Sequence, residues 1–111
     1  SLSVSDTLEV APVMPEFPGG QQALIQFLGK KIKYPTVAQG EMGLQGRVII
    51  RFVVDKEGNV VNPKVVRSVD PYLDKEALRI INQMPKWKPG ELEDGTKVAV
   101  YFTVPVMFRA Q

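Results

Sequence analysis

The stretch 96–108, TKVAVYFTVPVMF, has the two-residue period of a β-strand. Its apolar side chains share one face of that strand, at Val98, Val100, Phe102, Val104, Val106 and Phe108. Pro105 interrupts the segment, and proline, which has no N–H to donate, occurs in strands mainly at edges or bulges. The pattern predicts an apolar strand with an open edge, where unpaired backbone can bind another chain.

Two further segments have strand patterns. The stretch 46–55, GRVIIRFVVD, places Val48, Ile50, Phe52 and Val54 on one face. The loop 55–59, DKEGN, predicts a hairpin with a bulge, and 60–69 is the returning strand, which contains Pro63. Because the first of the three strands alone has no proline, we expect it at the centre of the sheet.

Helical spacing predicts two helices and one short helical turn. Residues 21–32 combine apolar positions with lysines near the end. The segment 35–43 begins with proline and is expected to form a short helical turn. Asp70 and Pro71 are typical of a helix start, and Pro85 of a helix end. The apolar stripe of this last helix is Leu73, Ala77, Ile80, Ile81 and Met84.

The expected fold class is α+β. The hairpin places the returning strand on one side of the central strand, and the helix crossing places 96–108 on the other side. This gives a three-stranded antiparallel sheet of order 2-1-3, with helices packed on one face and with Phe52 and Phe102 buried under them. Residues 1–18 are expected to be an extended lead-in, and residues 19–111 the folded domain.

Composition narrows the function classes. The 111 residues suit one domain, and 14 Lys and Arg against 12 Asp and Glu give a net charge of +2, too weak to indicate nucleic acid as a partner. The sequence has no histidine or cysteine, which removes the commonest general base and the commonest metal ligands. No nucleophile, base and oxyanion-hole grouping is evident. We therefore expect no enzyme, no metal site and no cofactor.

Three features leave alternatives open. The acids of DKEGN indicate a hairpin turn, and a calcium loop would need ligands that are missing here. Lys30, Lys31 and Lys33 form either a solvated helix end or a partner contact. Trp87 is interpreted as a core residue or as an interface anchor. The open edge itself either ends the sheet or accepts a strand from a partner.

A set of residues between 34 and 108 carries a family resemblance, in order and with natural loop lengths. They are Tyr34, Pro35, Ala38, Gly43, Gly46, Val48, Phe52, Val54, Gly58, Val60, Ser68, Leu73, Ala77, Pro89, Gly95, Pro105 and Phe108. On these residues the chain resembles the C-terminal domain of TonB-type energy transducers. The stretch MPEFPGG with the helix after it is similar to the lead-in of Bacteroidetes-type members.

The resemblance implies a function in transport. It implies a periplasmic domain whose parent is anchored in the inner membrane and coupled to an ExbB/ExbD-type motor; the anchor is expected to precede the residues printed here. It implies that the last strand binds the TonB box of TonB-dependent outer-membrane receptors through Ala99, Val100, Tyr101, Phe102, Thr103 and Val104. It also places Lys31, Lys33 and Tyr34 near the receptor.

Two alternatives accompany this interpretation. One is a periplasmic protein-binding scaffold or inhibitor-like module with no transport role. The other concerns assembly, because an exposed edge can also pair with a second copy and form a homodimer.

Overall fold

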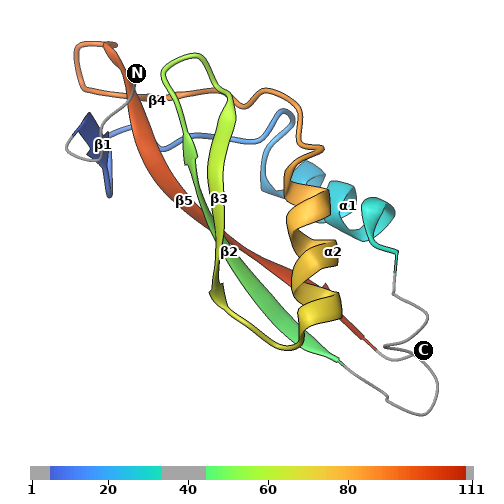
Figure 1. The fold of residues 1–111 in the computed structure, drawn as a ribbon. Helices are drawn as coiled ribbons and strands as arrows, with labels where there is room; N and C mark the ends of the chain where they lie inside the picture. The colour runs from blue at the N-terminus through green and yellow to red at the C-terminus, as the bar shows by residue number, and fades with distance from the viewer. Residues whose placement is uncertain (1–5, 34–44, 110–111) are drawn as a thin grey trace.

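The computed structural model describes residues 6–33 and 45–109. Figure 1 shows a curved, twisted sheet with both helices on one of its sides. The fold class is α+β, as expected, and the expected turn over 35–43 lies outside the described residues. The elements in chain order are β1 (Thr7–Leu8), α1 (Gln21–Lys31), β2 (Gly46–Val54), β3 (Val60–Arg67), α2 (Pro71–Ile81), β4 (Gly90–Glu91) and β5 (Lys97–Phe108).

The sheet has the order β1-β5-β2-β3, and β4 pairs with β5 off this path. Its long strands confirm the expected order, because β2 lies between β3 and β5 and is antiparallel to both. The expected count of three strands was too low. Two strands of two residues each were missed, and one of them, β1, runs parallel to β5. A two-residue strand shows no alternation, so hydrophobic periodicity cannot reveal it.

The β2–β3 hairpin closes through a turn over 55–59. The carboxylate of Asp55 accepts hydrogen bonds from the backbone N–H of Glu57 at 2.9 Å and of Asn59 at 2.8 Å, which supports the hairpin interpretation over the calcium loop. Gly58 has a φ of +88°, and a Cβ built on it would lie 2.1 Å from the carbonyl oxygen of Trp87. The irregularities of pairing lie within the strands instead of the loop, between Ile49 and Ile50 and between Arg51 and Val53.

The core lies between one face of β2 and β5 and the two helices. It contains Val48, Ile50, Phe52 and Val54 of β2 and Val104, Val106 and Phe108 of β5, packed with Leu24, Leu73, Ala77, Ile80 and Ile81 of the helices. Trp87 is 3% exposed and belongs to this core. Phe102 was expected to be buried with Phe52, but it is only partly buried.

Helix α2 begins where the sequence predicts and ends earlier than the sequence predicts. The Asp70 side chain accepts hydrogen bonds from the backbone N–H of Tyr72 at 2.8 Å and of Leu73 at 3.3 Å, so it is the N-cap. The helix ends at Ile81, short of the expected end at Pro85, and Met84 packs against the core from the segment that follows.

Candidate functional site

Strand β5 has one long edge that no other described strand covers. Its inner edge pairs with β2 from Val100 to Phe108. Its outer edge pairs with β1 only at Ala99 and Val100. Within the described ranges, the outer edge from Tyr101 to Met107 has no paired strand, and we call these residues the open edge.

Pro105 fixes which backbone groups face the open edge. It lies opposite Ile49, and the pairing of β2 with β5 runs past it without a register shift. A proline directed at β2 would remove a bond from that ladder, so its nitrogen faces outward. Successive residues of a strand direct their backbone groups to opposite sides. The backbone N–H groups of Tyr101, Thr103 and Met107 therefore face outward with Pro105, where they are free to bind.

A groove of about 830 Å³ lies beside the open edge, between β5 and α1. Residues 102–107 of β5 form one wall, and Leu24, Ile25 and Leu28 of α1 line the other, with 14–17 and Trp87 also lining it. Among the described residues that line the groove, only Glu16 and Arg109 are charged. Ile25 is 55% exposed, so α1 presents apolar surface to solvent where it borders the groove. The groove thus offers an apolar surface next to free backbone.

Aromatic rings support one end of the groove. The Trp87 ring centroid lies 4.9 Å from that of Phe102, 5.4 Å from that of Phe52 and 5.6 Å from that of Phe17, in edge-to-face arrangements. The buried indole Nε1–H has no hydrogen-bond partner among the described residues. Trp87 is the single tryptophan of the chain, so its fluorescence reports on this groove.

On the face of the sheet opposite the helices, the Arg51 side chain covers the start of the open edge. The Arg51 guanidinium lies 3.8 Å from the centroid of the Tyr101 ring, a cation–π contact. Arg51 also forms an ion pair with Glu9 of the lead-in at 2.5 Å. The lead-in and β5 are thereby connected where β1 ends and the open edge begins.

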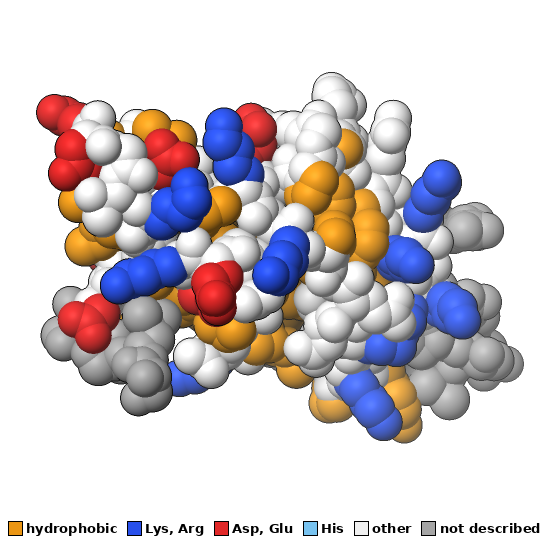
Figure 2. Space-filling view, turned by 90° about the horizontal axis from the view of Figure 1, so that it is seen from above, with side chains coloured by type: hydrophobic (Ala, Val, Ile, Leu, Met, Phe, Trp, Pro, Cys, Tyr) orange, Lys and Arg blue, Asp and Glu red, His pale blue; other side chains and the backbone are white. Residues whose placement is uncertain are grey.

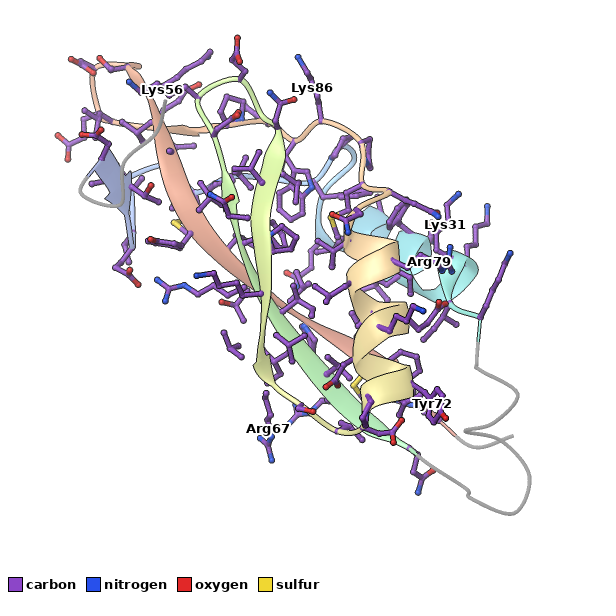
Figure 3. All side chains as sticks on the ribbon, viewed as in Figure 1. Lys31, Lys56, Arg67, Tyr72, Arg79 and Lys86 are labelled. Atoms are coloured by element: carbon purple, nitrogen blue, oxygen red, sulfur yellow. The ribbon has the colours of Figure 1, made fainter. Side chains whose placement is uncertain are left out.

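Helix α1 is held in place by a pair of charged residues on α2. Glu76 accepts hydrogen bonds from Arg79 at 2.6 and 2.8 Å and from the backbone N–H of Lys33 at 2.6 Å. Arg79 also donates to the carbonyl oxygen of Lys31 at 2.9 Å, and Figure 3 shows both residues at this end of the helices. Burial acts to raise the pKa of Glu76, but the hydrogen bonds from Arg79 and Lys33 outweigh it and hold that pKa below its usual value.

The structure divides the predicted site residues into three groups. Tyr101, Phe102, Thr103 and Val104 lie on the open edge, whereas β1 already occupies the edge at Ala99 and Val100. Lys31 and Lys33 are exposed residues at the end of α1, and the Lys31 ammonium lies 5.8 Å from the ring centroid of Phe27. Tyr34 lies outside the described residues.

The end of α1 belongs to a basic side of the molecule. In the view of Figure 2, Lys and Arg side chains are spread over the whole face, whereas the acidic side chains seen there lie on the left and in the centre, away from the end that α1 and α2 occupy in Figure 1. The expected contact of Lys31 and Lys33 with a partner stays a prediction.

Two parts of the site escaped sequence reasoning. Ile25 of the α1 wall was missed because it lies outside the apolar stripe of the helix, to which Leu24 and Leu28 belong. Its apolar character at an exposed position was the available signal. The pairing of β1 with the edge was missed because it depends on contacts between residues about ninety positions apart, Thr7 with Ala99.

Residues 6–33 and 45–109 contain neither a cluster suited to a metal ion nor a helix that could span a membrane. No group of three or more His, Cys, Asp or Glu side chains is placed there to hold a metal ion. No helix in that part of the chain is long and apolar enough to cross a membrane.

A family model, that of the Gram-negative bacterial TonB protein C-terminal, matches residues 30–110. The chain belongs to this family. It is accordingly a TonB-type periplasmic domain, and the family is a non-catalytic one related to transport.

Solved structures of the TonB C-terminal domain are similar to this chain. The solution structure of Helicobacter pylori TonB-CTD, residues 179–285, has a TM-score of 0.60 and 23% identity, covering 85% of this chain and 87% of its own. The solution structure of residues 194–285 has a TM-score of 0.58 and 25% identity, covering 78% and 89%. No curated protein matches this chain. The fold of this chain is therefore that of the TonB C-terminal domain.

Proposed function

We propose that this domain binds the TonB box of outer-membrane receptors by β-augmentation on the open edge of β5. The observation that carries the proposal is the unpaired edge from Tyr101 to Met107 next to an apolar groove. At about 3.4 Å per residue this edge is long enough for a short extended segment. Main-chain hydrogen bonds depend little on sequence, so one domain can bind the boxes of several receptors.

Coupling to transport is the second part of the proposal, and the family to which the chain belongs supports it. The parent protein would be anchored in the inner membrane and driven by an ExbB/ExbD-type motor, and this domain would transmit force to the receptor. A pull along the added strand loads several hydrogen bonds together. Lys31 and Lys33 at the end of α1, together with Tyr34, which follows them in the sequence, would contact the receptor around the box. No cofactor takes part in this function.

The test is a titration of the isotope-labelled domain with a synthetic peptide from the periplasmic end of a receptor. We expect the amides of Tyr101 and Thr103 to exchange fast in the free domain and slowly in the complex. Tyr101→Pro removes an outward N–H and obstructs an incoming strand, so it should weaken binding at least tenfold. Tyr101→Ala is the matched control, because it removes the side chain and keeps the N–H.

Two results would contradict the proposal. Slow exchange of both amides in a free monomer would show that the edge is closed. Chemical-shift changes confined to α1 and α2 would support a scaffold that binds through its helices. The titration belongs at low protein concentration, since the same edge can pair with a second copy of the chain, and the monomer should be verified by sedimentation.

A further inference from the structure

An added strand would place half of its side chains in the groove. Side chains alternate between the two faces of a sheet, and neighbours in register share a face. Val104 and Val106 of β5 lie on the core face, under the helices, and both line the groove. Every second side chain of a strand bound at the open edge would therefore point toward α1.

The surface that would receive these side chains is apolar and accessible. Ile25 is 55% exposed and Met14 38%, and both line the groove. Apolar side chains that cover them gain the free energy of removing apolar surface from water, while a hydroxyl in the same place would lose hydrogen bonds to water.

The charges of the groove fit an occupant that is uncharged in its middle. Glu16 lies at the end near Phe102, because its neighbour Phe17 packs on Trp87, which contacts Phe102. Arg109 lies at the other end, two residues after Met107. An extended peptide with a basic residue at the Glu16 end and an acidic residue at the Arg109 end is complementary to both.

The α1 wall is a feature of this chain beyond the matched family region. The family model matches residues 30–110, whereas α1 begins at Gln21 and the segment 14–17 precedes it. The family model therefore covers the open edge but not Ile25 and its neighbours. It does not describe a surface here that recognises the side chains of a bound strand.

We propose that α1 selects the partner segment by its side chains: the recognised strand carries aliphatic residues at alternate positions, which enter the groove between β5 and α1. This inference rests on the proposed function, because it requires a strand at the open edge. It adds a specificity-determining residue, Ile25, to a binding mode that otherwise depends on the backbone.

The test uses two peptides that form the same backbone bonds. The first is acetyl-Glu-Ser-Val-Ser-Val-Ser-Lys-amide, in which Glu, Val and Lys share one face of the strand, and the second replaces each Val with Thr, which has the same shape and a hydroxyl in place of a methyl group. Both are titrated against the unaltered domain, with Trp87 fluorescence and amide exchange as readouts. We expect the Val peptide to bind about tenfold more tightly than the Thr peptide.

Two variants locate the source of this preference. Ile25→Glu places a carboxylate in the groove and should reduce the preference for the Val peptide to less than about threefold. Gln26→Glu adds the same charge at the next position of α1, which is exposed and does not line the groove, so it should leave the preference unchanged. Thermal melts verify that both variants fold.

The outcomes separate this inference from the proposed function. Equal binding of both peptides, with protection of the Tyr101 and Thr103 amides, would overturn the inference and leave the proposed function standing. A preference that persists in Ile25→Glu would also overturn it. If neither peptide protects the edge amides at millimolar concentration, the inference fails together with edge pairing.

Discussion

The carboxylate of Glu76 on α2 accepts a hydrogen bond from the backbone N–H of Lys33, 2.6 Å away and 43 residues distant in sequence. Arg79 completes the arrangement by binding Glu76 and the carbonyl oxygen of Lys31. The last turn of α1 is thus fixed to α2, in addition to its apolar packing on the core. Because α1 is a wall of the groove, this charged pair positions the site.

The first prediction concerns the pH dependence of stability. The pKa of Glu76 is lowered in the folded protein from 4.5, so the ionised carboxylate stabilises the fold. This contribution is complete above pH 4.5 and is lost as the pH falls through the lower, folded pKa. Glu76→Gln should therefore be less stable than the parent near pH 7, and the difference should shrink below pH 4.5. Urea unfolding from pH 3 to pH 7 measures it.

Asp94 provides an internal control for that experiment. Its pKa is also lowered, by the side-chain and backbone hydrogen bonds of Thr96, and this contribution is the same in the parent and in Glu76→Gln. Both proteins should therefore lose some stability in acid. If the unfolding free energies of the two proteins change in parallel from pH 3 to pH 7, Glu76 does not contribute to the pH dependence of stability.

The second prediction concerns Gly58. A Cβ at this position would meet the Trp87 carbonyl oxygen at 2.1 Å, and its φ of +88° is unfavourable for other residues. Gly95 has a similar φ of +87°, but no atom lies within 4 Å of its Cβ position. Gly95→Ala should cost about 1–2 kcal/mol for the backbone conformation alone. Gly58→Ala should cost clearly more, and equal losses in denaturant unfolding would refute the steric argument.

The third prediction compares two phenylalanines that lie opposite each other in register. Phe52 and Phe102 have ring centroids 6.0 Å apart. Phe52 is 1% exposed, and Phe52→Ala should cost about 3–5 kcal/mol. Phe102 borders the groove and is only partly buried, so Phe102→Ala should cost less. It should also shift the Trp87 emission to longer wavelength, since the indole becomes accessible from the groove.

The difference in unfolding free energy between Phe52→Ala and Phe102→Ala decides whether Phe102 borders the groove or belongs to the core. Equal losses of unfolding free energy would mean that Phe102 is a core residue like Phe52 and that the groove does not reach Trp87. Fluorescence then supplies an independent measure, because an unchanged emission maximum in Phe102→Ala would point to the same conclusion.

The long elements could be predicted because their patterns repeat within each segment. The apolar face of β2 and the Asp70 cap of α2 are local properties, and proline in β3 and β5 correctly placed β2 at the centre. The short pairings could not be predicted in this way. The bond of β1 to β5 depends on backbone groups that meet only after folding, and two residues carry too little periodicity to indicate it.

In the candidate site, too, the local features could be predicted from the sequence and the long-range ones could not. Pro105 and the alternation around it indicated an open strand edge, which is a local pattern. The groove was not indicated, because it is formed by separate segments of the chain, α1, β5 and residues 14–17. The position of α1 in turn depends on Glu76 and Arg79, whose contacts with Lys31 and Lys33 are not evident from spacing.

The last prediction concerns the lead-in, which covers the edge at Ala99 and Val100. Removal of residues 1–9 takes away β1 and should lengthen the open edge toward the start of β5. The amide of Ala99 should then exchange faster in the free domain. A partner peptide lengthened at the end that lies near Glu16 of the domain should gain affinity in the truncated domain. The seven-residue Val peptide should bind as before, because the part of the edge that it covers is unchanged. Glu9→Gln is the matched control, since it breaks the ion pair with Arg51 and keeps β1 in place. If the longer peptide gains nothing from the truncation, β1 does not limit the length of the bound strand.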